Sequence, residues 1–391
     1  MVNFTILAGG FSSFIATYIF DTNSSTLSLT QQSTTGDNPS WIASHPQNSS
    51  ILYATNEDSP VGSLQSFLVN TDGSLTLVDT VTSRGNGPTF TNPLSTGEVT
   101  AMNFGSPNCS LVATLPDDPL HFQTDSPAVE FPVNGGPSNP HMSLEHGDEV
   151  LVTDLGADKI WRLGRDGPAG HFKVQGQIDV APGNGPRHMA ILDGILFVVN
   201  ELTSTLIALP IPSGPNGTTL PLIANVSTIP EDFADKSTFA VAEILISTPT
   251  EQFPNPLIYV SNRNTGTNLD PRGDSIAIFE FQQSCDTNTT SPSLSPRTHA
   301  RQWQTRQDDS DGSSASDVSG ELVLLAQVFT GLQQIRSMAL GRVEDGSDEY
   351  LIAGANVDGG VAMFQRVDGG RNLTLVARNT EIANRTSFVF V

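Results

Sequence analysis

The chain has 391 residues, and its 41 acidic residues outnumber the 18 Lys and Arg residues, giving a formal net charge of −23. This balance argues against a nucleic-acid-binding protein, because phosphate backbones are neutralised by Lys and Arg. No apolar run approaches the roughly 20 residues that a membrane-spanning helix needs, and 37% hydrophobic residues suffice for a folded core. We therefore expect a folded protein that binds neither nucleic acid nor membrane.

The chain begins without the positively charged segment and long apolar run of a signal peptide. It nevertheless contains nine Asn-x-Ser/Thr sequons, about twice the number expected by chance. The alternative is a set of accidental matches in a Ser-, Thr- and Asn-rich β protein. We expect a secreted glycoprotein whose signal peptide has been removed, with N-linked glycans as partners. The nine asparagines are Asn3, Asn23, Asn48, Asn108, Asn216, Asn225, Asn288, Asn372 and Asn384.

Short β-rich runs bounded by Gly, Pro, Asn and Asp recur along the chain, which is typical of an all-β protein. In chain order, seven apolar runs end in a small polar cluster, at residues 6–10, 51–57, 100–104, 150–155, 196–201, 257–263 and 351–356. The four steps between their terminal Asn or Asp residues, from Asn56 to Asn262, are 46 to 62 residues long. A period near 50 residues with about four strands per unit predicts a seven-bladed β-propeller. The prediction is one domain over residues 1–391.

Two features stand near the end of the repeats. A segment rich in Ser, Thr, Asp and Gln separates the sixth and seventh units, and we interpret residues 284–320 as a disordered surface insert without function. A leftover strand at residues 387–391 is expected to complete the first blade. The ring would then close by pairing of the N- and C-terminal strands, which removes exposed edges.

A turn that usually contains Pro precedes the repeats and aligns between them. In the last copy Ile335 stands in place of the Pro. The residues that follow this position are Ser40, Thr89, His141, Arg187 and Arg336. Equivalent propeller loops surround one central funnel, so these side chains should face a shared cavity. Their change from small hydroxyls to charged groups indicates a site. The alternative is that each charge satisfies a local carbonyl or carboxylate.

Polar residues at the ends of the apolar runs form a second ring, which comprises Glu57, Asp154, Asn200, Glu201, Asn262, Arg263 and Asn356. Asp154, Asn262 and Asn356 are interpreted as turn residues, because Asn and Asp often bond their own backbone there. Glu201 and Arg263 are stronger site candidates, because an unpaired charge facing a funnel is costly. We expect Glu243, at the entry of the sixth unit, to pair with an arginine.

At these positions the chain resembles the seven-bladed lactonase family, which includes bacterial 6-phosphogluconolactonases and fungal carboxy-cis,cis-muconate cyclase. The resemblance covers essentially the whole chain and is most specific at residues 139–141, 152–158, 185–189, 199–202 and 259–263. In the cyclase branch, a His, two Arg and a Glu in these motifs form the proposed catalytic group. The last unit departs from the family, with Ile335-Arg336 in place of a Pro-Arg turn.

The resemblance implies a catalytic group of His141, Arg187, Glu201 and Arg263. Two guanidiniums can stabilise charge on oxygen, and a histidine can move a proton near neutral pH. Glu201 can act as a second acid/base or fix an arginine. The residues expected to bind substrate are Trp41, Phe90, Met142, His188, Asn200, Glu243 and Arg336.

The sequence shows no P-loop, dinucleotide fingerprint or nucleophile elbow, and its histidines lack metal-ligand spacing. We therefore predict no cofactor and no metal. Two cysteines, Cys109 and Cys285, exclude a disulfide scaffold and a Cys-ligated zinc site. Whether these two cysteines pair is left open by the sequence.

The main functional prediction is a secreted, cofactor-free cyclase of fungal metabolism that forms an oxygen-containing ring in a small oxygenated metabolite. The resemblance extends to fungal enzymes of hetero-Diels–Alder cycloaddition, so cyclisation and cycloaddition are both kept. The first alternative is a lactone hydrolase of the lactonase type. The second is a non-catalytic propeller that serves as a binding platform.

Overall fold

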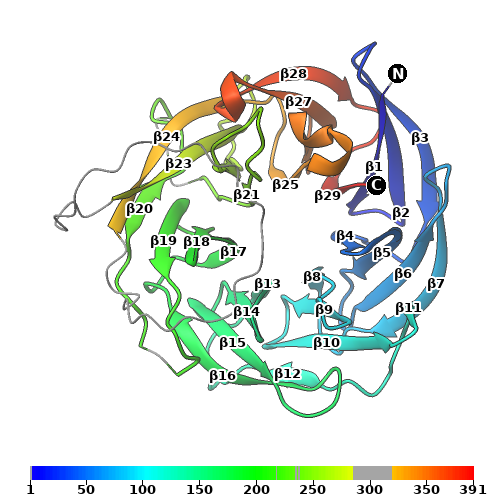
Figure 1. Cartoon of the computed structure of the whole chain (residues 1–391), viewed down its shortest axis with the longest axis vertical. Coiled ribbons are helices and arrows are strands. Elements are labelled where there is room, and N and C mark those ends of the chain that lie inside the picture. The colour runs from blue at the N-terminus through cyan, green and yellow to red at the C-terminus, as the bar shows by residue number, and fades with distance from the viewer. Residues whose placement is uncertain (1, 217, 234–235, 237, 285–318) are drawn as a thin grey trace, which may run out of the picture.

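The computed structural model describes residues 2–216, 218–233, 236, 238–284 and 319–391. These residues form seven antiparallel sheets that stand side by side around a central axis (Figure 1). The fold is therefore the seven-bladed β-propeller, in a single domain, that the repeats predict. None of the described helices is long and apolar enough to cross a membrane.

Each blade runs from an inner strand beside the axis to an outer strand at the rim (Figure 1). Blade 1 consists of β29 (Arg385–Phe390), β1 (Asn3–Gly10), β2 (Phe14–Asp21) and β3 (Thr26–Thr34). Blade 2 consists of β4 (Ile42–His45), β5 (Asn48–Asn56), β6 (Ser63–Val69) and β7 (Leu75–Thr82). Blade 3 consists of β8 (Pro88–Phe90), β9 (Glu98–Asn103), β10 (Asn108–Leu115) and β11 (Asp118–Phe122), with β12 (Ala128–Glu130) also paired to β10.

The other four blades repeat this order. Blade 4 consists of β13 (Pro140–His146), β14 (Glu149–Asp154), β15 (Lys159–Arg165) and β16 (Phe172–Asp179). Blade 5 consists of β17 (Pro186–Leu192), β18 (Ile195–Asn200), β19 (Thr205–Pro210) and β20 (Ala224–Ser227). Blade 6 consists of β21 (Ile244–Ile246), β22 (Leu257–Ser261), β23 (Ser275–Ser284) and β24 (Ser319–Phe329). Blade 7 consists of β25 (Ile335–Leu340), β26 (Tyr350–Ala355), β27 (Val361–Val367) and β28 (Asn372–Asn379), and short 3-10 turns lie at Val343–Asp345, Ser347–Glu349 and Asp368–Gly370.

The second strand of each blade carries much of the core. β18 is buried along its whole length, because neighbouring blades cover both of its faces and leave no solvated side for polar residues. Leu151 of blade 4 and Leu196 of blade 5, for example, share one apolar cluster. The continuous apolar runs of the sequence are therefore the layers that hold blade against blade.

The two chain ends meet in one blade, as predicted. β29 pairs antiparallel with β1, with Val389 opposite Leu7 and Phe388 opposite Ala8. The predicted closing strand spanned residues 387–391, whereas the observed strand begins at Arg385. This pairing closes the ring and covers the edge of β1 that would otherwise be unpaired.

Both ends of the segment predicted as an insert, residues 284–320, belong to strands. Ser284 ends β23, and Ser319 and Gly320 begin β24, where Gly320 lies opposite Gln283. These three residues are therefore strand residues because the hairpin pairs them, and the rest of the insert lies outside the described residues. Cys285 also lies there, while Cys109 is buried in the core of blade 3.

One predicted glycosylation site conflicts with the fold. Asn108 is buried, and its side-chain amide donates a hydrogen bond to Glu130. A glycan cannot be attached to an amide enclosed in this way, so the prediction for Asn108 is wrong in the folded protein. Asn288 lies outside the described residues. The exposed or half-buried sequon asparagines are Asn3, Asn23, Asn48, Asn216, Asn225, Asn372 and Asn384.

Candidate active site

A small hollow, which we call the central hollow, lies at the axis where the inner strands begin, and its empty space of about 230 Å³ includes open solvent at its mouth. Its wall contains all five side chains that the aligned turns predict to face a shared cavity, so that prediction is confirmed. The residues that line the central hollow are Phe11, Ser40, Trp41, Glu57, Thr89, His141, Arg187, Arg336 and Thr386.

A repeated irregularity of the inner strands aims these side chains at the axis. In β17, Pro186 lies opposite Asn200 and His188 opposite Val199, so Arg187 has no opposite residue. The same register shift occurs in four other blades, where the residues without an opposite partner are Thr89, His141, Arg336 and Thr386. Such a β-bulge turns one side chain out of the normal alternation of a strand. The bulged residues therefore converge on the axis, whatever their chemistry.

The bulged residues, together with Ser40, which precedes β4 at the equivalent place of blade 2, divide the central hollow in two by their chemistry. Blades 1, 2 and 3 contribute the hydroxyls of Thr386, Ser40 and Thr89, which we call the hydroxyl half. Blades 4, 5 and 7 contribute His141, Arg187 and Arg336, which we call the charged half. In blade 6, Glu243 forms a backbone hydrogen bond with Ser261, and in blade 5 His188 lies opposite Val199 in the same way. Glu243 is therefore equivalent to His188, and Ala242 occupies the position that Arg187 has in blade 5.

Glu201 joins the two central arginines. Its Oε2 lies 2.8 Å from Nε of Arg187 and 2.8 Å from Nη2 of Arg263. Arg187 also donates from Nη1 to the carbonyl of Ala242 at 2.6 Å, and Arg263 donates from Nε to the carbonyl of Ala240. Both guanidiniums are thus held against the chain that enters blade 6, so they are oriented before any ligand arrives.

Burial governs the titration of this group. Burial, and after it the neighbouring charge of Arg263, lower the pKa of Arg187 to about 9. Burial also lowers the pKa of Arg263. For Glu201 burial would raise the pKa, but Arg263 and Arg187 outweigh it and hold the pKa below its ordinary value. Glu201 is therefore a carboxylate at neutral pH, which fits the predicted role of fixing an arginine.

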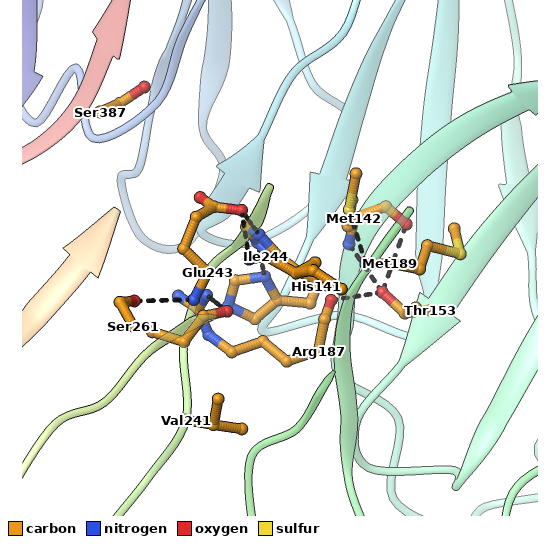
Figure 2. Close-up of polar contacts among 12 residues, drawn as sticks. His141, Met142, Thr153, Arg187, Met189, Val241, Glu243, Ile244, Ser261 and Ser387 are labelled. Carbon is orange, nitrogen blue, oxygen red and sulfur yellow. Dashed lines mark hydrogen bonds and ion pairs between the residues drawn. The ribbon is translucent and has the colours of Figure 1, made fainter. Parts of the chain in front are cut away.

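His141 lies in a chain of buried polar groups. Nδ1 of His141 is 3.1 Å from Nε2 of His188, and Nδ1 of His188 is 2.8 Å from Oε1 of Glu243. Burial and the charge of Arg187 lower the pKa of His141 well below its ordinary value, so its imidazole is neutral at pH 7. Figure 2 shows Glu243, His141 and Arg187 gathered at the ends of their strands. The prediction that Glu243 pairs with an arginine is wrong, because His188 lies nearer to its carboxylate.

The hydroxyl half contains hydroxyl groups that can form hydrogen bonds with a ligand. The hydroxyl of Thr89 is buried and has no hydrogen-bond partner within the described residues. Ser40 lies beside the carboxyl group of Glu57, whose pKa is raised by burial. An unpartnered buried hydroxyl is costly unless water or a ligand satisfies it. This half therefore suits a ligand that carries hydroxyl groups of its own.

The structure places the predicted substrate-binding residues in two groups. Trp41 and Arg336 line the central hollow, whereas Phe90, Met142, His188, Asn200 and Glu243 do not. Phe90, Met142 and His188 each follow a bulged residue and return to the normal alternation of the strand, which turns their side chains between blades. Phe90 and Met142 pack in an apolar cluster, and Asn200 is buried with its amide donating to Thr205.

Two lining residues, Phe11 and Thr386, were not singled out from the sequence, and Glu57 was identified only as a member of the second polar ring. For Thr386 a signal existed, because it stands in the closing strand at the place that Ser40 and Thr89 occupy in theirs. Glu57 follows the apolar run of its repeat, as Glu201 does in blade 5. For Phe11 we find no sequence signal.

Two larger hollows, of about 1040 and 790 Å³, lie at the opposite ends of the strands, around the turn that contains Asp148. There Arg162 is paired with Glu149 and donates to two carbonyls, and Arg165 pairs with Glu98. These charges already have partners, so the central hollow is the stronger candidate despite its smaller volume. Within the described ranges, no three His, Cys, Asp or Glu side chains gather as metal ligands.

Comparisons with known proteins agree on the fold. The sequence profile described as "Lactonase, 7-bladed beta-propeller" matches residues 5–301. A protein of Arthroderma benhamiae named "Probable 6-phosphogluconolactonase" is 29% identical over 287 residues, which are 69% of this chain and 68% of that protein. The "6-phosphogluconolactonase" of Bacillus subtilis is 25% identical over 393 aligned positions, covering 97% of this chain and 94% of that protein.

Solved structures match over the whole chain. The periplasmic gluconolactonase of Pseudomonas aeruginosa superposes with a TM-score of 0.73 at 14% identity, covering 100% of this chain and 99% of that one. A protein from Lactobacillus plantarum gives a TM-score of 0.75 at 18% identity, with both chains fully covered. At these identities the likeness extends to the fold alone.

Proposed function

Because the chain belongs to the seven-bladed β-propeller lactonase family, we propose that it hydrolyses a lactone of a polyhydroxylated, sugar-type acid in the central hollow. The observation that carries this proposal is the neutral imidazole of His141 beside the fixed guanidinium of Arg187 in one wall. The names of the two relatives support the reaction class, since both are called 6-phosphogluconolactonases.

The charged half supplies what ester hydrolysis requires. In the proposed reaction, His141 takes a proton from a water molecule while the water oxygen bonds to the lactone carbonyl carbon. The electron pair of the carbonyl moves to its oxygen, where Arg187 stabilises the negative charge. The tetrahedral intermediate then reforms the carbonyl and breaks the ring C–O bond, and the alkoxide receives the proton from His141. One water is consumed and one hydroxy acid is formed.

The substrate class follows from the two halves of the central hollow. Hydroxyl groups on the lactone can bond to Ser40, Thr89 and Thr386, which line the central hollow from three adjacent blades. The Thr386 hydroxyl already donates to the carbonyl of Ser40, so it can still accept a hydrogen bond. Arg336 lies over the ring of Phe11 at 5.6 Å and has no carboxylate partner among the described ion pairs. A guanidinium in this state suits an anionic group on the substrate or the carboxylate of the product.

Ring formation, the main prediction from the sequence, uses the same donors but needs no water. The names of the relatives favour hydrolysis over cyclisation or cycloaddition, so we place ring formation second. A non-catalytic platform is third, since a carboxylate shared by two buried guanidiniums is unnecessary for simple docking.

The test is acid release from a panel of lactones followed in a pH-stat. The panel contains glucono-1,5-lactone, its 6-phosphate and an unsubstituted six-membered lactone. We expect both sugar lactones to be opened faster than the spontaneous rate, and Arg187→Met protein to lose this activity. Arg342→Ala, which alters an exposed ion pair with Asp345, is the matched control and should keep it. Spontaneous rates with every lactone would contradict the proposal.

Export through a secretory pathway also stays a proposal, supported by the seven sequon asparagines at the surface. Protein from a eukaryotic source should lose mass when N-glycans are removed enzymatically. An unchanged mass would contradict this part of the proposal and leave the proposed reaction untouched.

A further inference from the structure

We propose that Glu243 and His188 are positioning residues for His141. Together they form a buried relay, Glu243–His188–His141, that places a proton on Nδ1 of His141 and leaves Nε2 unprotonated toward the central hollow. The inference rests on the proposed function in one respect, because the base that the relay positions is the base of lactone hydrolysis. The protonation pattern itself follows from the hydrogen bonds.

The pattern starts at Glu243. A carboxylate has acceptors and no donor, and Oε1 of Glu243 lies 2.8 Å from Nδ1 of His188 and 3.1 Å from the backbone N–H of Ile244. Nδ1 of His188 must therefore carry the proton of that bond. Burial lowers the pKa of His188, so its imidazole is neutral at pH 7 and carries one proton. Its Nε2 is then an acceptor.

The second ring follows from the first. Nε2 of His188, as an acceptor, lies 3.1 Å from Nδ1 of His141, so Nδ1 of His141 must donate. His141 is also neutral, which leaves its Nε2 with a lone pair. Nε2 has no hydrogen-bond partner in the part of the chain that the structure describes, and His141 lines the central hollow. A lone pair in this place can accept a proton from water.

The surroundings hold His188 in one orientation. Its ring is edge-on to Trp41, with centroids 5.1 Å apart at 80°, and to Phe90, at 5.5 Å and 78°. The His188 side chain is 0% exposed, so water cannot replace either of its hydrogen bonds. Glu243 is fixed in turn, because its backbone N–H donates to Ser261. A rigid second layer of this kind is what sets the tautomer of a catalytic histidine.

Blades 5 and 6 are also where the repeat departs from its pattern. The residue after the bulge is Trp41, Phe90, Met142, Ser337 or Ser387 in the other blades. The equivalent residues are His188 in blade 5 and Glu243 in blade 6. His188 lies in β17, and Glu243 directly precedes β21 of the adjacent blade. A base and an acid at neighbouring copies of a position that is elsewhere apolar or small fit a paired role.

The charges around the relay define its pH behaviour. His141 is faced by Arg187, Arg336 and Arg263, all of which oppose its protonation. His188 is faced by Glu243 and, at greater distance, by Arg187 and Glu201. When His141 accepts a proton, its Nδ1–H bond to His188 strengthens, and the carboxylate of Glu243 offsets the new charge.

The direct test is ¹⁵N NMR of protein labelled at its histidines, which distinguishes a protonated ring nitrogen from an unprotonated one. His141→Gln and His188→Gln variants assign the signals. We expect both rings to be protonated at Nδ1 and unprotonated at Nε2 at pH 7. A proton on Nε2 of His141 would overturn the proposal. This readout needs no substrate, so it decides the relay even if no lactone is hydrolysed.

Kinetics gives the second test. Glu243→Gln keeps the shape of the side chain but removes its charge, so we expect kcat for the sugar lactone to fall about 100-fold with KM nearly unchanged. Glu149→Gln is the matched control, because Glu149 is a half-buried partner of a buried arginine far from the central hollow. A loss of kcat with both variants, or with neither, would contradict the relay.

Discussion

The hydroxyl half and the charged half of the central hollow are built on the same backbone. Thr89 and Arg187 each occupy a bulge between a Pro that is paired and a residue that is paired again. Their side chains therefore reach the axis in the same way, yet one offers a neutral hydroxyl and the other a guanidinium. The difference shows that the propeller fixes where a side chain points, while the residue at the bulge decides what it does.

The two halves also differ in how their groups are held. Arg187 is 1% exposed, forms an ion pair with Glu201 and donates from Nη1 to the carbonyl of Ala242, whereas the Thr89 hydroxyl has neither kind of partner within the described residues. Preorganised donors are typical of groups that stabilise a transition state. Unsatisfied hydroxyls are typical of groups that wait for a ligand. We therefore expect the charged half to affect kcat and the hydroxyl half to affect KM.

The largest effect should come from the charged half. Arg187→Met removes the charge that faces the developing oxyanion, and we expect kcat/KM for the preferred lactone to fall about 100- to 1,000-fold. Steady-state kinetics measures the fall, and thermal unfolding checks that the variant is folded. A folded variant within threefold of the parent activity would show that the charged half does not carry the reaction.

Within the charged half, Glu201→Gln should have a smaller effect on kcat than Arg187→Met. It leaves Arg187 and Arg263 buried side by side without their shared carboxylate, so we expect a loss of stability of about 3 kcal/mol. We also expect kcat to fall about tenfold, because the guanidiniums lose their fixed orientation. Chemical denaturation and kinetics of the same preparation measure both. An unchanged unfolding free energy would contradict the role assigned to Glu201.

The double variant Ser40→Ala, Thr89→Val tests the hydroxyl half. It should raise KM for a polyhydroxylated lactone about tenfold and leave kcat close to the parent value. The unsubstituted lactone of the same ring size is the control, because it has no hydroxyls to lose partners. Equal changes for the two lactones would show that the two halves do not divide binding from catalysis.

The smallest effect is expected from pH near neutrality. Because the pKa of His141 is lowered, the base is already unprotonated at its ordinary pKa, and activity should fall only as the pH drops below that value. On the alkaline side, activity should fall as the pH rises through about 9, where Arg187 loses its proton. A kcat/KM profile between about pH 5 and 10 measures both limbs. An acid limb centred at or above the ordinary histidine pKa would contradict a buried neutral His141.

Much of this architecture was predictable, because repetition along the chain becomes repetition around the axis. The period near 50 residues indicated propeller blades, the seven apolar runs gave their number, and the leftover strand indicated the closure. The aligned turns identified five neighbours, which are Ser40, Thr89, His141, Arg187 and Arg336. These inferences need only the pleat of a strand and the closure of a ring.

The pairing inside the site was not predictable in the same way. His188 lies 47 residues from His141 and 55 residues from Glu243 in the chain. Their contact depends on how far adjacent inner strands stand apart at the axis, which no local pattern encodes. The prediction that Phe90 and Met142 bind substrate was wrong for a related reason. Their apolar character is equally typical of a ligand wall and of the packing between blades, and the register of the strand decides.

The central claim, that the central hollow opens a lactone with water, is tested most directly by hydrolysis in ¹⁸O-labelled water. Parent protein and the Arg187→Met variant are incubated briefly with the preferred sugar lactone, and the product is examined by mass spectrometry. The account predicts rapid formation of a hydroxy acid with one ¹⁸O in its carboxyl group, at a rate that the variant loses. A product of unchanged mass, a product that joins two reactants, or equal rates with both proteins would contradict it.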